Sequence, residues 1–278
     1  MPITIDSVLR EGTRAHGDEF RLTLDPRLSG LPDTAHGGSV LAAFQAVAGA
    51  DGPKRVSGNY RKRVPLGVAL RLTLRRERDD AVCRLFDAAG GVMVEGGVGE
   101  VSGARPAPWP AGEHGDPLPV SSTCVACGVD NALGLRAQLF FDDERVWTRW
   151  VPRETAARAD GSLAPIALTT LLDEAAFWLG ALASGESGMT TELAVTLDRS
   201  IAFGEPVIVA GERSRTRARG DSRFWETEVT AADTSGRIVA SGRIVFVAVR
   251  GAARRLLGGF LSRSSPEVLR RIFPAYAG

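Results

Sequence analysis

The chain has 278 residues, 44% of them hydrophobic, which predicts two packed domains rather than a disordered chain. Lys and Arg (34) nearly balance Asp and Glu (33), so the composition argues against a nucleic-acid-binding protein. Three cysteines are too few for a disulfide framework and favour a reducing compartment. No signal peptide and no apolar run near the ~18 residues of a membrane span are evident, so we expect a cytoplasmic protein without a membrane partner.

A short apolar helix is expected over residues 38–50, where Leu41, Phe44 and Ala48 recur at helical spacing. The segment before it, TAHGG, places His36, Gly37 and Gly38 at the helix entry. Free backbone N–H groups there can stabilise negative charge on a carbonyl oxygen, and glycine lets a substrate approach the backbone. The helix itself carries no acid.

Two segments repeat the same hairpin pattern, at residues 83–101 and 227–247. Asp87 and Gly90 in the first match Asp233 and Gly236 in the second, and both predict a strand, a tight turn and a strand. The chain therefore reads as two related halves, each with one apolar helix and three or four long antiparallel strands.

Five prolines mark residues 105–120 as a linker between a first domain over 1–104 and a second over 121–249. The remaining residues, 250–278, form a basic tail. A short helix is expected in this tail, with Ser265 as its N-cap and Pro266 in its first turn.

The helix of the second half is expected over residues 165–182, beginning at Pro165. It carries Asp173 and Glu174 between apolar neighbours, and a carboxylate in such surroundings needs a reason to be there. The alternatives are a solvated helix face for the two acids and an ordinary strand position for Thr190, which follows the helix.

Three segments of the second half resemble phenylacetyl-CoA-thioesterase-like hotdog proteins: CVACGVDNALGLRAQLFF (124–141), TTLLDEAAFW (169–178) and GMTTELAVTLDRSIAFGEPV (188–207). The first half matches through HGG and its hairpin. The resemblance implies a tandem, or double, hotdog: an α+β fold of two curved antiparallel sheets, each wrapping a central helix, joined as a pseudo-dimer within one chain.

In that family the catalytic acid lies nine residues after the His. Nine residues after His36 the first half has Gln45. In the second half Ala164 stands at the position of the His, and Asp173 follows nine residues later. Sites in the family are shared between subunits, which implies one complete site here. It would combine His36, Gly37 and Gly38 with Asp173 and Thr190. The other site would set Pro165, which has no N–H, and Ile166 against Gln45, and would be inactive.

The resemblance implies an acyl-CoA thioesterase that needs no metal or redox cofactor, with coenzyme A only as part of its substrate. Asp173 would attack the carbonyl or activate water, and the residues do not separate these roles. His36 is expected to position the carbonyl or its loop rather than to act as the main base.

Four residues are candidates for substrate binding. Asn131 would shape the entry loop and could line the site, and Glu174 neighbours the acid. Arg213 and Arg215 alternate in ERSRTRARG, so we expect them on one strand face, where they could hold coenzyme A phosphates or simply form a charged edge strand.

Cys124 and Cys127 have the spacing of metal ligands. However, no second pair follows and the three histidines are scattered, so a structural role is expected instead.

Two rival functions stay open: a non-catalytic acyl-CoA or acyl-ligand binding protein, and an enoyl-CoA hydratase. The hydratase is ranked last because that chemistry usually needs an Asp and a His a few residues apart, and no such pair occurs. A homodimer of double-hotdog chains is a further option.

Overall fold

The computed structural model describes residues 2–49, 52–78, 80–101, 106–257 and 265–276. The first half contains α1 (Ile5–Gly12), β1 (Thr13–His16), β2 (Glu19–Thr23), α2 (Gly37–Ala48), β3 (Lys54–Tyr60), β4 (Ala69–Glu77), β5 (Asp80–Phe86) and β6 (Val92–Gly99). The second half contains β7 (Asp116–Pro117), β8 (Phe140–Phe141), β9 (Arg145–Trp150), α3 (Pro165–Ser184), β10 (Gly188–Leu197), β11 (Val207–Glu212), β12 (Arg217–Arg219), β13 (Asp221–Ala232) and β14 (Ile238–Ala248). Helices α4 (Ala252–Leu257) and α5 (Pro266–Ile272) follow at the C-terminus, and short 3₁₀ turns lie at Pro26–Leu28, Glu154–Ala156 and Arg213–Arg215.

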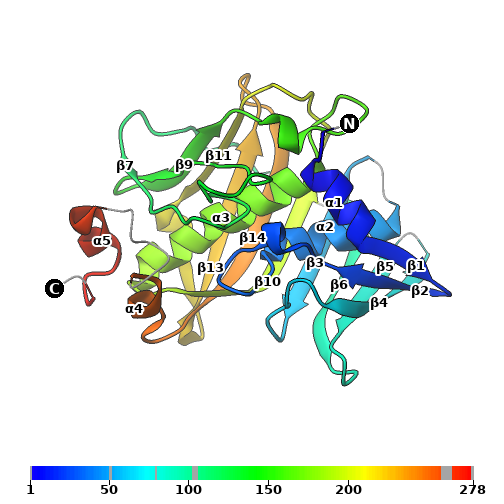
Figure 1. Ribbon diagram of the computed structural model, residues 1–278. Coiled ribbons are helices and arrows are strands. Elements are labelled where there is room, and N and C mark those ends of the chain that lie inside the picture. Colours follow the sequence, from blue (N-terminus) through cyan, green and yellow to red (C-terminus); the bar gives the residue numbers. More distant parts are fainter. Residues whose placement is uncertain (1, 50–51, 79, 102–105, 258–264, 277–278) are drawn as a thin grey trace.

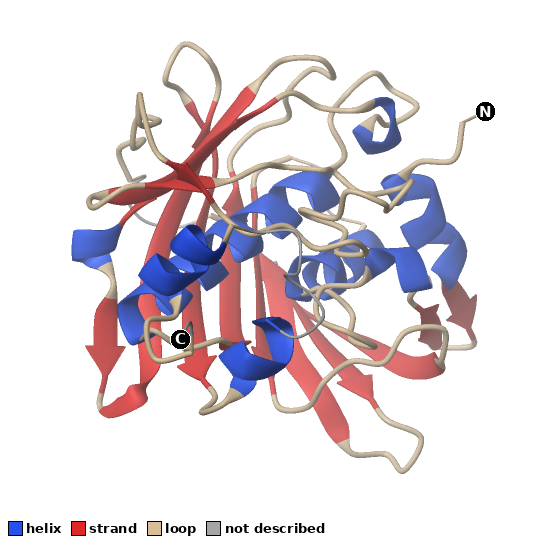
Figure 2. Cartoon of the chain, turned by 60° about the vertical axis from the view of Figure 1, so that its left-hand side comes forward, coloured by secondary structure: helices blue, strands red, loops and turns tan. Residues whose placement is uncertain are grey.

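The strands of both halves form one continuous antiparallel sheet, in the order β1-β2-β4-β5-β6-β3-β10-β14-β13-β11-β9-β8-β7, with β12 added beside β13. The two expected sheets are therefore joined edge to edge into one, because β3 of the first half pairs directly with β10 of the second. Figures 1 and 2 show this sheet curving behind the helices α2 and α3. The expected α+β architecture, with a curved antiparallel layer wrapping one central helix in each half, is confirmed.

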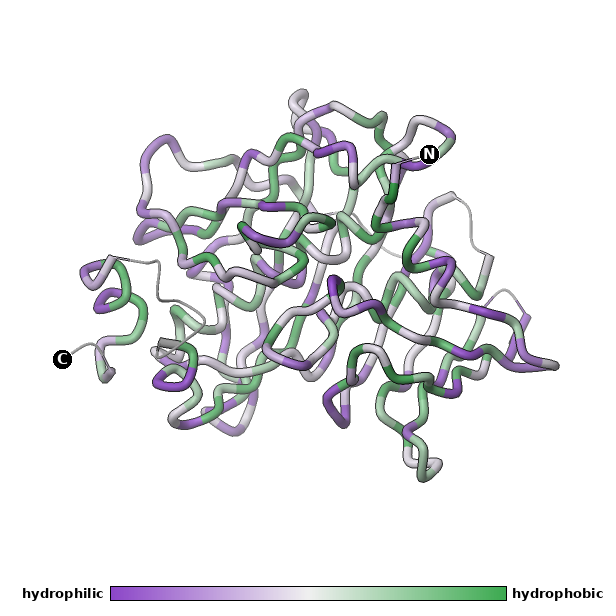
Figure 3. The backbone as a smooth tube through the Cα atoms, in the orientation of Figure 1, coloured by the Kyte–Doolittle hydropathy of each residue, from purple (hydrophilic) through white to green (hydrophobic). Residues whose placement is uncertain are grey.

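Both central helices are buried, and each ends at a glycine in the left-handed conformation. Gly49 closes α2 with φ 63° and Gly185 closes α3 with φ 64°. Hydrophilic residues are frequent in the peripheral loops, whereas the central elements are largely apolar (Figure 3). The apolar side chains of the two helices therefore build the core.

Helix α3 corrects one expectation from the sequence. This helix of 20 residues is long and apolar enough to span a membrane, with a mean hydropathy of 1.4 over an 18-residue window. However, 83% of that window is buried inside the protein, so the apolar surface of this helix is already covered by the sheet and by α2.

The two matched hairpins are confirmed as β5–β6 and β13–β14, with Gly90 (φ 80°) and Gly236 (φ 79°) in the turns. Ser265 caps α5 as expected. The expected boundary between residues 104 and 105 lies outside the described residues. Within the proline-rich segment, Asp116–Pro117 pairs with β8 at the edge of the sheet, so this segment is not wholly a linker.

Candidate active site

Glycine at position 38 lets the two central helices touch at their N-terminal ends. A Cβ atom there would lie 2.5 Å from the backbone carbonyl of Thr169 in α3. The Thr169 hydroxyl donates a hydrogen bond to the Gly38 carbonyl (2.8 Å). This close crossing carries Asp173, one turn further along α3, to the N-terminus of α2.

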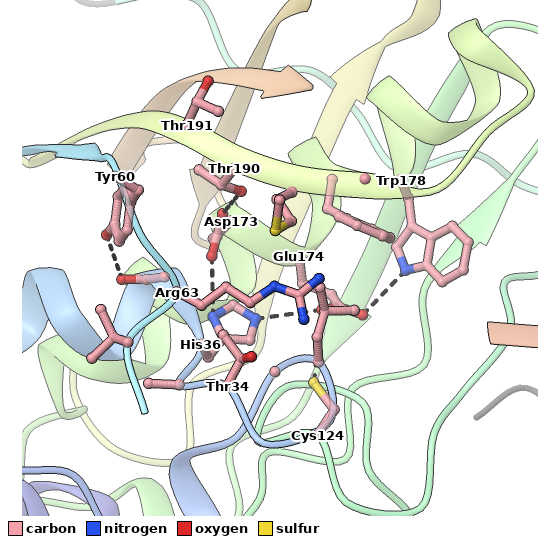
Figure 4. A pocket seen from close by; sticks show the side chains of 18 of the residues that line it. Thr34, His36, Tyr60, Arg63, Cys124, Asp173, Glu174, Trp178, Thr190 and Thr191 are labelled. Atoms are coloured by element: carbon pink, nitrogen blue, oxygen red, sulfur yellow. Dashed lines mark hydrogen bonds and ion pairs between the residues drawn. The ribbon is translucent and has the colours of Figure 1, made fainter. Parts of the chain in front are cut away.

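Asp173 is 4% exposed and has partners from both halves. Its Oδ2 accepts the Gly38 N–H (3.1 Å) and its Oδ1 accepts the Thr190 hydroxyl (2.7 Å). Thr190 is positioned by a β-bulge in β10 between Thr190 and Glu192, and such bulges re-aim neighbouring side chains. Figure 4 shows Thr190, Asp173 and His36 connected in this order.

His36 lies between two carboxylates. Its Nδ1 is 3.1 Å from Asp173 Oδ2, and its Nε2 is 3.4 Å from Glu174 Oε2. Burial by itself would lower the pKa of His36, but Asp173 and Glu174 outweigh it and hold the pKa well above 6.5. The Gly38 N–H lies within hydrogen-bond distance of both His36 Nδ1 (3.2 Å) and Asp173 Oδ2 (3.1 Å), and only the carboxylate can accept it when Nδ1 carries a proton.

The N–H of Gly37 has no hydrogen-bond acceptor among the residues that the structure describes. Its carbonyl accepts a hydrogen bond from the Tyr60 hydroxyl (2.7 Å), which fixes the orientation of the peptide. Burial raises the pKa of Tyr60, so the phenol remains a donor. Sequence reasoning missed Tyr60, because nothing in the pattern of β3 distinguishes this residue from other strand aromatics.

A cavity of about 410 Å³ lies over these groups. It forms where β3 and β10 separate, since their pairing ends at Asn59 and Glu192. His36, Gly37, Asp173, Glu174 and Thr190 all line it, together with Tyr60, Cys124, Cys127, Phe177 and Trp178. The fold thus brings five of the nine candidate residues to one cavity, and Gly38 lies beneath it in the helix crossing.

Three candidates for substrate binding lie elsewhere. Asn131 does not line the cavity, because its amide is used to hold the entry loop against the first half: Nδ2 donates to the carbonyls of Arg27 (2.7 Å) and Thr123 (2.9 Å). Arg213 and Arg215 do not share a strand face, since Arg213–Arg215 is a 3₁₀ turn. Arg213 donates to the carbonyl of Asp142 (2.7 Å) instead.

The cations that line the cavity come from residues 61–63, directly after β3. Arg61 pairs with Glu95 (3.5 Å) and Lys62 pairs with Asp87 (2.6 Å). Arg63 is exposed and extends across the pocket in Figure 4, and no ion-pair partner is found for it among the described residues. Arg63 is therefore available to an anionic group at this cavity.

The pseudo-symmetric position holds a second, smaller cavity of about 90 Å³, lined by Gln45 and Pro165 among others. Ala164 at the start of α3 makes no side-chain cap, and Pro165 has no N–H. The two composite positions expected from the sequence both exist, and only the larger one combines free backbone N–H and a carboxylate.

The floor of the larger cavity contains two thiols. Cys124 Sγ lies 3.8 Å from Glu174 Oε2, and the other oxygen of Glu174 accepts a hydrogen bond from the Trp178 indole (3.1 Å). The hydrogen bond with Cys124, together with burial, holds the pKa of Cys127 well above its usual range. Ligand atoms of His36, Cys124 and Glu174 all lie within 4.8 Å of one another, so this group has the composition of a metal site.

No protein-family model matches the sequence, and no curated protein is significantly similar to it. Solved structures do match over most of their length. A provisionally named thioesterase from Novosphingobium aromaticivorans is 22% identical, with a TM-score of 0.59, covering 86% of this chain and 98% of its own. A protein of unknown function with a hot dog fold from Alicyclobacillus acidocaldarius is 13% identical (TM-score 0.56; 88% and 97% covered).

An acyl-CoA thioesterase II from Mycobacterium marinum is 14% identical (TM-score 0.57; 88% and 98% covered). The matches also include a GphF dehydratase, 14% identical with a TM-score of 0.51, covering 89% of this chain and 91% of its own. At these identities, the likeness establishes the double hotdog fold over nearly the whole chain.

Proposed function

We propose that this protein is an acyl-CoA thioesterase with one active site, built across its two halves. The observation that carries the proposal is that Asp173 and Gly37 are neighbours lining the 410 Å³ cavity, and that the Gly37 N–H has no acceptor among the described residues. A carboxylate and an unpaired amide at a helix N-terminus are the two groups that thioester hydrolysis needs. Similarity in fold to thioesterases adds support.

The thioester carbonyl oxygen would accept the Gly37 N–H, because negative charge develops on that oxygen as the carbonyl is attacked. Asp173 would attack the carbonyl carbon or take a proton from an attacking water, while Thr190 and the Gly38 N–H hold the carboxylate in place. The C–S bond then breaks, and water and thioester yield a carboxylic acid and the free thiol of coenzyme A.

His36 would act as a positioning residue, because its imidazole contacts the two acids rather than the free amide. Phe177 and Trp178 offer apolar surface for the acyl group. Arg63, in place of Arg213 and Arg215, would bind a coenzyme A phosphate, since it is the cation at the cavity with no partner in the described part of the chain.

The test is release of free thiol from a panel of short, medium, long and aryl acyl-CoA substrates. Asp173→Asn keeps the size of the side chain but removes its negative charge, and it should abolish hydrolysis. Gln45→Ala, the matched change in the smaller cavity, should leave hydrolysis unchanged. Acyl-CoA binding without hydrolysis of any thioester would reject the enzyme and leave the non-catalytic binding protein.

A second candidate is hydration or dehydration of an acyl thioester at the same site. No His lies near Asp173 along the chain, but the fold places His36 Nδ1 3.1 Å from Asp173 Oδ2. Such a pair can exchange a proton with substrate carbon and oxygen. Loss of enoyl-thioester absorbance without thiol release would favour this candidate over hydrolysis.

The cytoplasmic location, the homodimer and the absence of nucleic-acid and membrane partners stay predictions from the sequence.

A further inference from the structure

The large cavity is lined by two buried side chains, Cys124 and Glu174, that hydrolysis at Asp173 does not use, and both lie beside His36. Cys124 comes from the entry loop of the second half, Glu174 from α3 and His36 from the entry of α2. All three are buried, and one ligand atom of each lies within 4.8 Å of the others. Sequence spacing hid this group, because its members are 50 or more residues apart.

We propose that His36, Cys124 and Glu174 form a zinc-binding site. An imidazole nitrogen, a thiolate and a carboxylate oxygen are the ligand types that zinc takes in proteins. With ordinary zinc–ligand bond lengths and tetrahedral angles, the N···O and S···O separations should be about 3.3 and 3.6 Å. The observed separations are 3.4 Å between His36 and Glu174 and 3.8 Å between Cys124 and Glu174. These two separations are within about 0.2 Å of the required values, and the third, between His36 and Cys124, is within 4.8 Å.

Each of the three side chains also has a hydrogen-bond partner outside the group. Asp173 faces His36 Nδ1, so that Nε2 points to the group (Figure 4). The Trp178 indole donates a hydrogen bond to Glu174 Oε1 (3.1 Å), so Oε2 is the oxygen that faces His36 and Cys124. The Ala126 N–H donates to Cys124 Sγ (3.3 Å). Outer contacts of this kind orient the ligands of metal sites.

The fourth coordination position would face the cavity, because all three ligands line it. A divalent cation there would also offset the buried carboxylates of Asp173 and Glu174, which are 4% and 8% exposed. Asp173 and the Gly37 N–H are not ligands, so the site neither requires nor excludes the proposed hydrolysis. The alternative is that the Cys124 thiol only donates a hydrogen bond to Glu174.

The experiment uses the full chain, reduced and stripped of metal with a chelator, and titrated with cobalt(II). A thiolate ligand produces a near-ultraviolet charge-transfer band, which zinc should then abolish by displacing the cobalt. We expect the band in the unchanged protein and in Cys83→Ser, and its loss in Cys124→Ser. Cys83 is the matched control: it is buried in β5, and its pKa is raised to about 12 by burial.

Glu174→Gln provides a second, independent test, because it keeps the size of the side chain and an acceptor for Trp178. Zinc affinity should fall by more than about tenfold, at least the loss produced by changing outer contacts alone. Absence of the band in the unchanged protein, or the same band in Cys124→Ser, would overturn the proposal. If Cys124→Ser does not fold, unchanged zinc affinity in Glu174→Gln refutes the site on its own.

Discussion

Gly37→Ala is expected to impair hydrolysis by displacing Asp173 while leaving the fold intact. The added Cβ would lie 2.7 Å from Asp173 Oδ2, whereas ordinary contacts begin at 3.4 Å, so the carboxylate must move by about 0.7 Å (3.4 − 2.7). Misplacement of a reacting group by ~1 Å can cost about 10²-fold in rate. We therefore expect kcat to fall between about 10- and 10²-fold, equivalent to roughly 1.4–2.7 kcal/mol in the activation free energy.

The free energy of unfolding should change little, and the two effects can be separated. The added Cβ would meet the end of one side chain rather than backbone, and alanine costs no more than glycine at the first position of a helix. The N–H of residue 37 remains, so KM should stay close to its original value. The assay is thiol release under saturating acyl-CoA, with a thermal melt of the same preparation and Gln45→Ala as the control on α2. Undiminished kcat in a folded Gly37→Ala protein would refute the geometry, and so would a loss of activity that tracks unfolding.

Three further results are expected. Gly38→Ala should destabilise the fold by about 1–3 kcal/mol in chemical denaturation. Its Cβ would lie 2.5 Å from the Thr169 backbone, and no side-chain rotation can relieve a clash with backbone atoms. Tyr60→Phe should lower kcat about fivefold, the factor for a hydrogen bond of ~1 kcal/mol, with an unchanged melt; an unchanged kcat would mean that the peptide needs no such anchor. Burial alone would raise the pKa of Glu186, but hydrogen bonds, including that of the Tyr276 hydroxyl, lower it below 4.5. The stabilisation of the C-terminal segment is thus present above pH 4.5 and lost as pH falls through the lowered value, so acid should increase proteolysis there, and Glu186→Gln should remove this dependence.

The hairpins and central helices could be predicted from sequence, because local physical chemistry determines them. Asp and Gly at matched spacing specify a tight turn that needs a positive φ, as at Gly90 and Gly236. Apolar periodicity with Pro165 at one end and glycine at the other defines α3. Local patterns do not pair Gly37 with Asp173; that pairing follows only from the resemblance to a family in which such sites are shared.

Errors arose where a side chain's role depends on what approaches it in space. The alternating arginines predict a strand, but Arg213–Arg215 forms a 3₁₀ turn, and the Arg213 side chain donates a hydrogen bond to the Asp142 carbonyl. Asn131 was a candidate for the cavity, yet its amide is satisfied by the carbonyls of Arg27 and Thr123. Neither partner is recognisable from the local sequence pattern.

The sequence by itself determined the duplicated architecture and the unequal halves, since Gln45 and Asp173 are visible as soon as the two helices are aligned. Only the tertiary structure decided how those halves meet. The pairing of β3 with β10 fuses them into one sheet, and its end at Asn59 and Glu192 opens the cavity. The crossing at Gly38 then brings His36 to Asp173, 137 positions away, because a helix without a Cβ at that point can approach its neighbour closely enough.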